Sequence, residues 1–382
     1  MNYNISEQAL SFHEVLPWQG QIPPLEVQPD GSVIIKITAS QAELVTFSVD
    51  DKEYSCIRRE NGVWEGIFPY RTGHHYVQIK MDGMEILSPL LPIGYGYSRP
   101  YNYIELPQDD FYQLKNVPHG SVRNEYFYSE ITGGWERCVI YTPAEYEEEK
   151  GKIFPVLYLQ HGHGENEVSW TTAGKVNFIL DNLTAEKKIV PFVVVMCNGM
   201  VQRVDEKGKR IVDFKLLEEQ LVKECIPFAE KKFRIGKKRE LRAMAGLSMG
   251  SLQTSITGFC HPELFSALGL FSGFVTDIIQ GTSLDMVERG KSNNEHLRIL
   301  ENEKRFAELF PVFFRSMGDQ DPFWECFVQD DKLLEEKGIH QIRKVYRGAH
   351  DWNVWRKSFL DFAQMLFRQG CKEGVETKRR DE

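Results

Sequence analysis

A serine lies between two glycines where an apolar segment gives way to an amphipathic one. Residues 246–250 match the pattern Gly-x-Ser-x-Gly around Ser248. The preceding run, "LRAMAGLS", is typical of a buried strand, and the following run, "GSLQTSITGFCHP", is typical of a helix. On a sharp turn from strand to helix the flanking positions must be glycine, because larger side chains would strike neighbouring backbone. The pattern predicts a nucleophilic serine. The alternative is a small residue that only fills a tight corner.

A serine hydroxyl needs a base to take its proton, and the base needs an acid to orient it. After a strand–serine–helix turn of this kind, the acid and then the histidine follow in chain order. Asp319 and Asp321 come directly after the strand-like "PVFFRSMGD", and His350 follows the last strand-like segment. We therefore predict a triad of Ser248, one of these two aspartates and His350. A capping or buried role for the histidine stays open.

Acyl transfer also needs backbone N–H groups to bind the oxyanion of the tetrahedral intermediate. The residue after the nucleophile, Met249, should supply one of them. The second should come from the loop after "FPVLYLQ", which reads His-Gly-His-Gly at residues 161–164. We assign it to His163. A metal site at His161 and His163 is an alternative, but no cysteine is near, so we expect no metal and no cofactor.

The segments that must position these residues alternate between strand and helix patterns from about residue 120 onward. "FPVLYLQHG" and "VPFVVVMCNG" are continuous apolar runs, as in strands buried on both faces of a parallel sheet. "FKLLEEQLVKECIPFAEKKF" has apolar residues at helical spacing. The alternation predicts an α/β domain with a mostly parallel central sheet at residues 106–372, followed by a charged tail at 373–382.

The first hundred residues show a strand pattern without helices between the strands. β-branched runs such as "SVIIKITAS" are joined by turn signals, among them Asn61-Gly62 and Asp82-Gly83. No segment with helical periodicity interrupts them. We predict a small all-β sandwich which, with a linker rich in proline, glycine and tyrosine, occupies residues 1–105.

Composition narrows the functional classes. The net charge of −9 argues against nucleic acid and anionic membranes as partners. No apolar run approaches the roughly 20 residues of a membrane span, and the N-terminus lacks the features of a secretory signal, so we expect a cytoplasmic protein. The seven cysteines form no C-x-x-C pair and predict reduced, mostly buried thiols. A homo-oligomer is left open.

Five segments of the chain, taken in order, resemble one known family. They are "YLQHGHGENEVSW", "AGLSMGS", "HPELFSALGLFSG", "SMGDQD" and "GAHDWNVWR". Together they resemble the esterase D-like branch of the α/β-hydrolases, especially carbohydrate esterase family 1, the feruloyl and acetylxylan esterases. The resemblance covers about residues 120 to 370 and implies an α/β-hydrolase fold. The preceding β domain resembles the immunoglobulin-like or carbohydrate-module-like domains that often precede such esterases.

The resemblance also implies roles for single residues. The family's nucleophile falls on Ser248 and its histidine on His350. The family's acid usually stands third after a glycine, which here selects Asp321 over Asp319. Its oxyanion donors fall on Met249 and on His163, the residue after His161-Gly162.

The substrate that the resemblance implies is a small-molecule or oligosaccharide ester, with feruloyl or acetyl groups on plant-derived xylo-oligosaccharides as our first hypothesis. Several aromatic residues stand near the expected cleft and could stack on an aryl acid or a sugar, although ordinary packing is the alternative for each. These are Trp170, Phe274, Trp324 and Trp352. The long segment between Gly273 and Pro311 could form a lid or one wall of the acyl pocket.

Three other functions stay open. A siderophore trilactone esterase would share the fold, and its anionic substrate would call for a basic cleft, for which Arg123, Arg137 and Arg203 are candidates. A non-catalytic carbohydrate-binding protein on the same frame would be expected to lack part of the triad. An acyltransferase is the third, because an alcohol can replace water in attacking an acyl-enzyme.

Overall fold

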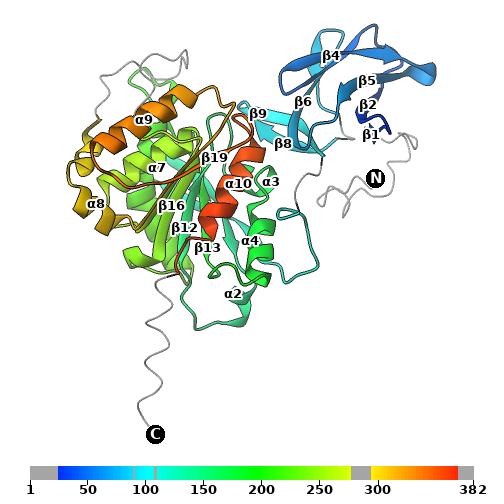
Figure 1. Ribbon diagram of the computed structural model, residues 1–382. Helices are drawn as coiled ribbons and strands as arrows, with labels where there is room; N and C mark the ends of the chain where they lie inside the picture. The colour runs from blue at the N-terminus through cyan, green and yellow to red at the C-terminus, as the bar shows by residue number, and fades with distance from the viewer. Residues whose placement is uncertain (1–24, 89–90, 107–109, 277–293, 369–382) are drawn as a thin grey trace. The chain divides into compact units, whose positions relative to one another are not determined.

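The computed structural model describes residues 25–88, 91–106, 110–276 and 294–368 (Figure 1). The chain divides into two compact units, Met1–Asp110 and Phe111–Glu382. The division falls five residues beyond the predicted boundary at 105. The charged tail and residues 277–293 of the long segment after Gly273 lie outside the described residues.

In its described part the first unit is a nine-stranded antiparallel sheet with the order β1-β2-β5-β4-β3-β6-β9-β8 and β7 paired to β6. The strands are β1 (Leu25–Val27), β2 (Ser32–Thr38), β3 (Val45–Val49), β4 (Lys52–Arg58), β5 (Val63–Pro69), β6 (Gly73–Met81), β7 (Met84–Ile86), β8 (Ile93–Gly96) and β9 (Arg99–Leu106). A short 3₁₀ turn, Glu60–Gly62, joins β4 to β5. Alternate residues of β2, such as Val33 and Ile35, are fully buried in one apolar core.

Two features of this unit bear on the sequence predictions. Asn61 and Gly62 have φ angles of 58° and 72°, and Asp82 and Gly83 have 50° and 80°, so both dipeptides form the tight turns expected of them. The unit is all-β and antiparallel, as predicted. Strand β4 pairs with both β3 and β5, so the strands form one continuous hydrogen-bonded path.

The second unit contains a mixed sheet of order β10-β11-β13-β12-β16-β17-β18-β19. Its strands are β10 (Ser121–Ser129), β11 (Gly134–Thr142), β12 (Val156–Gln160), β13 (Val193–Cys197), β16 (Arg242–Leu247), β17 (Ala267–Phe271), β18 (Val312–Gly318) and β19 (Ile342–Tyr346). The six strands from β13 to β19 pair in parallel, whereas β10 and β11 are antiparallel additions at one edge. A separate hairpin joins β14 (Gln202–Val204) to β15 (Arg210–Val212).

Helices flank both faces of this sheet. They are α2 (Glu145–Glu148), α3 (Ser169–Thr172), α4 (Val176–Ala185), α5 (Leu217–Gln220), α6 (Ile226–Lys232), α7 (Met249–Cys260), α8 (Glu303–Leu309), α9 (Trp324–Glu336) and α10 (Trp352–Ala363). Shorter 3₁₀ or π segments cover Phe214–Leu216, Leu221–Cys225, Arg239–Leu241 and Asn294–Glu301.

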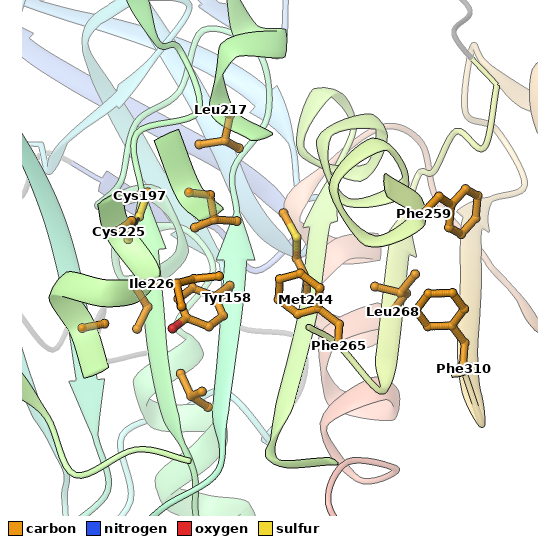
Figure 2. Packing of buried hydrophobic residues seen from close by; sticks show 14 of the residues in the cluster. Tyr158, Cys197, Leu217, Cys225, Ile226, Met244, Phe259, Phe265, Leu268 and Phe310 are labelled. Carbon is orange, nitrogen blue, oxygen red and sulfur yellow. Dashed lines mark hydrogen bonds between the residues drawn. The ribbon is translucent and has the colours of Figure 1, made fainter. Parts of the chain in front are cut away.

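Neighbouring residues of one strand show which helices share a face. Leu268 lies beside Gly258 of α7, whereas the next residue, Gly269, lies beside Phe362 of α10. Successive residues of a strand point to opposite faces, so α7 and α10 cover opposite sides of the sheet (Figure 1). The side chains of β12, β16 and β17 that face α7 form a continuous core with Tyr158 and Met244 at its centre (Figure 2).

The same core contains buried thiols. The Sγ atoms of Cys197 and Cys225 lie 2.9 Å apart, and Cys138 is also fully buried. The six cysteines in the described part of the chain are free, in agreement with the predicted thiols, although Cys260 is exposed rather than buried.

The strand order reverses its direction at β12. The chain passes from β12 to β13 on one side and then returns to place β16 on the other side. In open parallel sheets, functional sites form beyond the carboxyl ends of the strands at such a switch point. The loop after β12 and the turn after β16 both begin there.

Candidate active site

Ser248 occupies the turn between β16 and α7 with φ 50° and ψ −117°. This backbone conformation is rare for a residue with a side chain, and it persists because the surroundings leave no alternative. A Cβ atom on Gly250 would lie 2.5 Å from the carbonyl oxygen of His161, and one on Gly246 would lie 2.3 Å from the carbonyl oxygen of Gly250. Both flanking glycines are thus required by backbone contacts, as the motif predicts.

The three side chains of the predicted triad come together beyond the carboxyl ends of β16, β18 and β19. The Nε2 atom of His350 is 2.9 Å from Ser248 Oγ, and its Nδ1 atom is 2.8 Å from Asp321 Oδ2. His350 and Ser248 are 102 residues apart in the chain. They meet because adjacent parallel strands end at the same edge of the sheet.

Asp321 lies in a buried position that still suits a charged carboxylate. Its Oδ2 atom accepts hydrogen bonds from His350 and from Ser272 Oγ at 2.8 Å, and its Oδ1 atom accepts one from the Phe323 N–H at 2.9 Å. Burial by itself raises the pKa of Asp321, but these hydrogen bonds and the charge of His350 outweigh it and hold the pKa below its ordinary value. The carboxyl group is therefore ionised at neutral pH.

Asp319, the other candidate acid, has a different place. Its Oδ1 atom accepts a hydrogen bond from the Gly348 N–H at 2.9 Å, and its own N–H donates to the Tyr346 carbonyl at 2.8 Å. It therefore ties the end of β18 to the loop that carries His350. The geometry brings Asp321 to the imidazole and gives Asp319 a role in holding the loop.

The loop after β12 lies against Ser248. A Cβ atom on Gly162 would stand 3.5 Å from the Cβ atom of Ser248, and the Gly162 N–H is already held by Glu165 at 2.9 Å. The next residue, His163, has an exposed side chain. Met249 is the first residue of α7, where an N–H has no acceptor within the helix. The two predicted oxyanion donors therefore belong to segments that meet at Ser248.

His161 has a structural role that the sequence did not indicate. Its buried ring accepts a hydrogen bond at Nε2 from the Gly199 N–H and bonds through Nδ1 to the Gly162 carbonyl, both at 2.8 Å. A backbone N–H can only donate, so Nε2 must be the unprotonated nitrogen. Burial lowers the pKa of this imidazole, which keeps it neutral. Since both nitrogens are engaged, the ring is not available to a metal ion.

Two of the predicted substrate-binding aromatics belong to the core instead. Trp170 and Trp352 are each 1% exposed and pack edge to face, with ring centroids 5.2 Å apart. The Trp170 indole N–H donates to the buried Gln160 carbonyl at 2.9 Å. Neither ring has surface to offer a ligand, so the prediction that they bind substrate is wrong. The cause is that helices α3 and α10 turn these rings onto the sheet.

Trp324 is half-buried at the start of α9. Its ring packs against Phe327, with centroids 6.0 Å apart, and beneath the guanidinium group of Arg343 at 5.8 Å. These contacts place it toward β19, and none of them involves the triad.

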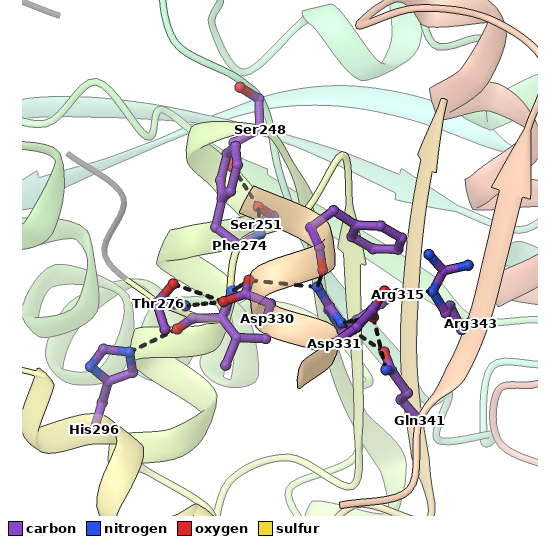
Figure 3. Close-up of polar contacts among 12 residues, drawn as sticks. Ser248, Ser251, Phe274, Thr276, His296, Arg315, Asp330, Asp331, Gln341 and Arg343 are labelled. Atoms are coloured by element: carbon purple, nitrogen blue, oxygen red, sulfur yellow. Dashed lines mark hydrogen bonds and ion pairs between the residues drawn. The ribbon is translucent and has the colours of Figure 1, made fainter. Parts of the chain in front are cut away.

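Phe274 lies beside the site but is only 3% exposed, so it supports the site from behind rather than offering a surface to substrate. Its ring packs with Met249 in a small apolar cluster and lies edge to face with Phe323 at 5.3 Å, and Phe323 in turn lies 5.2 Å from the His350 ring. The Phe274 N–H donates to Ser251 Oγ at 3.0 Å, and that hydroxyl donates to the Ser248 carbonyl at 2.6 Å (Figure 3).

The segment after Phe274 is fixed from helix α9. A buried carboxylate, Asp330, accepts hydrogen bonds from the Val275 N–H and from the Thr276 hydroxyl, both at 2.7 Å, and Arg315 stands 3.5 Å away (Figure 3). This network anchors Phe274 from its C-terminal side.

Sequence reasoning missed two residues at the site, Ser272 and Trp355. Ser272 follows β17 and donates to Asp321, while the Trp355 indole N–H donates to Ser272 Oγ at 2.9 Å. The segments "GLFSG" and "DWNVWR" contain them, but serine and tryptophan are too common for their type alone to have singled them out.

The three arginines considered for a basic cleft each bind a different carboxylate. Arg123 pairs with Glu147, Arg137 with Glu167, and Arg203 with Asp213. Their charges are therefore partly neutralised at three separate places. Over the described ranges, no helix is long and apolar enough to cross a membrane.

Comparison with known proteins gives a consistent family. The esterase family model matches residues 129–366. An endo-1,4-beta-xylanase/feruloyl esterase of Xylanibacter ruminicola is 38% identical over 363 residues, which is 91% of this chain and 46% of that protein. The chain thus spans about half the length of this relative. An acetyl esterase of Caldicellulosiruptor saccharolyticus is 23% identical over 219 residues, covering 53% of this chain and 79% of that one.

Solved structures agree at the level of the fold. A ferulic acid esterase superposes with a TM-score of 0.56 at 23% identity, covering 66% of this chain and 99% of its own. The enterobactin esterase of Shigella flexneri superposes with a TM-score of 0.64 at 15% identity, covering 93% of this chain and 99% of its own.

Proposed function

Since the chain belongs to the esterase family, we propose that it is a carboxylic ester hydrolase with Ser248 as nucleophile, His350 as general base and Asp321 as the acid that orients it. The observation that carries this proposal is the unbroken relay of hydrogen bonds, 2.9 Å and 2.8 Å long, from the Ser248 hydroxyl through the imidazole to the carboxylate.

The reaction follows from that relay. Ser248 Oγ attacks the ester carbonyl while His350 Nε2 takes its proton, and Asp321 stabilises the imidazolium that forms. His350 then returns the proton to the leaving alcohol, which leaves an acyl group on Ser248. A water molecule, deprotonated by His350, attacks the acyl-enzyme and releases the acid. No cofactor enters any step.

The oxyanion of each tetrahedral intermediate would be bound by the N–H groups of Met249 and His163. Two features support this assignment. The Met249 N–H is at a helix N-terminus, where the helix dipole favours negative charge. The loop that carries His163 approaches Ser248 closely through Gly162.

The substrate we favour is a feruloyl ester of a plant-derived xylo-oligosaccharide. The relative with 38% identity is named as a feruloyl esterase joined to a xylanase. In this chain the partly exposed Phe323 lies beside His350, with the buried Phe274 packed behind it, and the Phe323 ring would pack against a hydroxycinnamoyl group. An acetyl ester is the alternative acyl group, and it would make less use of that ring.

A second candidate is a siderophore trilactone esterase. It is favoured by the enterobactin esterase structure, which covers 93% of this chain. The pairing of Arg123, Arg137 and Arg203 with acidic partners speaks against it, because an anionic catecholate would need unpaired positive charge.

One screen separates these functions. The wild-type protein and Ser248→Ala are compared on methyl ferulate, an aryl acetate and a catecholate trilactone, with fluorophosphonate labelling of both proteins. We expect labelling of the wild type alone, the highest kcat/KM on methyl ferulate, and a loss of about 1,000-fold or more in kcat for Ser248→Ala. A trilactone preference would support the second candidate. A wild-type protein that neither labels nor hydrolyses any ester would point to a carbohydrate-binding role. Adding an alcohol and analysing the products would reveal acyl transfer.

A further inference from the structure

Ser272 and Trp355 form a buried pair behind the triad that the reaction above does not use. Ser272 follows β17 with a φ of 44° and is fully buried, and Trp355 lies on α10 and is 6% exposed. A positive φ is strained for a serine, because its Cβ atom crowds the backbone. Such strain persists only where the surroundings fix the residue, and it gathers at functional sites.

The donor and the acceptor of each hydrogen bond made by Ser272 can be assigned. An indole N–H can only donate, so Ser272 Oγ must accept the bond from Trp355 at 2.9 Å. An ionised carboxylate can only accept, so the Ser272 hydroxyl proton must point to Asp321 Oδ2, 2.8 Å away. The indole therefore determines where the hydroxyl proton lies. The oxygen that receives it is the one that faces His350.

Trp355 also contacts His350, the residue that Asp321 orients. Its ring lies edge to face with the His350 ring, with centroids 5.1 Å apart and planes at 88°. Phe323 packs against another side of the imidazole at 5.2 Å. Trp355 is itself held by Trp352, whose ring stands edge to face at 5.1 Å. The buried Trp352 thus supports Trp355, which in turn packs against His350.

We propose that Ser272 and Trp355 are positioning residues of the hydrolase, which keep Asp321 Oδ2 directed at His350 while the imidazole gains and loses a proton. This inference rests on the proposed function. With the hydroxyl bond in place the carboxylate cannot rotate away without leaving a buried donor unpaired. Without that bond, Oδ2 is held only by the histidine that it must orient.

The test uses the full-length protein and a soluble aryl ester. For Ser272→Ala we expect kcat to fall about 10- to 100-fold with KM changed by less than about twofold, because the acid loses alignment while the substrate contacts remain. Trp355→Phe keeps an aromatic ring and removes the donor, and kcat should fall about 3- to 10-fold. Because both changes break the same chain of hydrogen bonds, the double variant should be about as slow as Ser272→Ala alone, and its loss should be well short of the product of the two single effects.

A spectroscopic readout separates positioning from stability. The proton between His350 Nδ1 and Asp321 should give a low-field NMR resonance in the wild type, which should shift or broaden in both variants. Ser255→Ala is the matched control: this serine is also fully buried and bonds to a backbone carbonyl, of Leu252, in helix α7. It should keep the resonance and the wild-type kcat. Trp355→Phe, which removes the indole donor to Ser272, provides the second variant if Ser272→Ala does not fold.

The outcomes are separable. Hydrolysis and labelling by the wild type test the proposed function, independently of these variants. If that activity is present and Ser272→Ala, or Trp355→Phe where the alanine variant does not fold, keeps both the wild-type kcat and the resonance, the positioning role is refuted. It is also refuted if Ser255→Ala loses as much activity as Ser272→Ala.

Discussion

Replacing Asp321 by asparagine should greatly reduce kcat, whereas the same replacement of Asp319, two residues away, should have little effect. Asp321 and Asp319 differ from asparagine by one atom, so Asp321→Asn and Asp319→Asn change charge and hydrogen bonding with little change in shape. Asp321 Oδ2 accepts bonds from two donors, His350 Nδ1 and Ser272 Oγ, while Oδ1 accepts from the Phe323 N–H. An asparagine has only one oxygen to meet these three donors.

The expected loss of kcat in Asp321→Asn follows from the tautomer that His350 must adopt. If the amide oxygen of Asp321→Asn faces Phe323, its NH₂ group faces the imidazole, which must then present an unprotonated Nδ1. Nε2 would carry the proton and could no longer take one from Ser248. The same change of tautomer in a serine protease costs about 10⁴-fold in kcat, equivalent to about 5 kcal/mol of transition-state stabilisation. We expect a loss of this order.

Asp319→Asn should be mild. The Gly348 N–H that Asp319 accepts can be accepted equally well by an amide oxygen, so we expect less than about a threefold change in kcat. The assay is kcat and KM on a soluble aryl ester, with urea unfolding to show that both variants are folded. A larger loss in Asp319→Asn than in Asp321→Asn, or an Asp321→Asn variant within tenfold of the wild type, would refute the assignment.

Four other perturbations test the remaining parts of the site. Because burial lowers the pKa of His161 below that of the unfolded chain, the unfolded state binds more protons, and stability should fall as the pH drops below about 6.5, by up to about 1.4 kcal/mol per pH unit. His161→Gln should lose that part of the slope in urea unfolding between pH 7 and 5.5, and equal slopes would contradict the argument. Gly250→Ala should destabilise the fold by about 1–3 kcal/mol, because the new methyl group meets backbone, whereas the matched Gly151→Ala, which points into open space, should not. Trp170→Phe removes the hydrogen bond to the buried Gln160 carbonyl and should cost about 1–3 kcal/mol of stability with KM unchanged; a changed KM at unchanged stability would return this residue to the substrate site. Phe323→Ala should lower kcat/KM about 10-fold or more on methyl ferulate and by less than about threefold on an aryl acetate, and equal losses would remove this ring from acyl recognition.

The positions of Ser248 and His350 could be predicted because their signals are local. The turn around Ser248 needs glycines on both sides, and that requirement is visible in five consecutive residues. His350 follows a strand pattern, and the carboxyl ends of parallel strands share one edge of a sheet. The choice between Asp319 and Asp321 needed the family resemblance, since both follow the end of β18 within three residues.

What the amino-acid sequence determines by itself is the alternation of strands and helices, the strained serine turn and the order in which a serine, an acid and a histidine follow each other. The tertiary structure alone decides that Trp170 and Trp352 are buried, and that Ser272 and Trp355 stand behind Asp321. The physical reason is the distance along the chain over which each interaction acts. Backbone strain and periodicity depend on neighbours within a few residues, whereas burial and hydrogen-bond partners depend on which helix packs onto which face of the sheet.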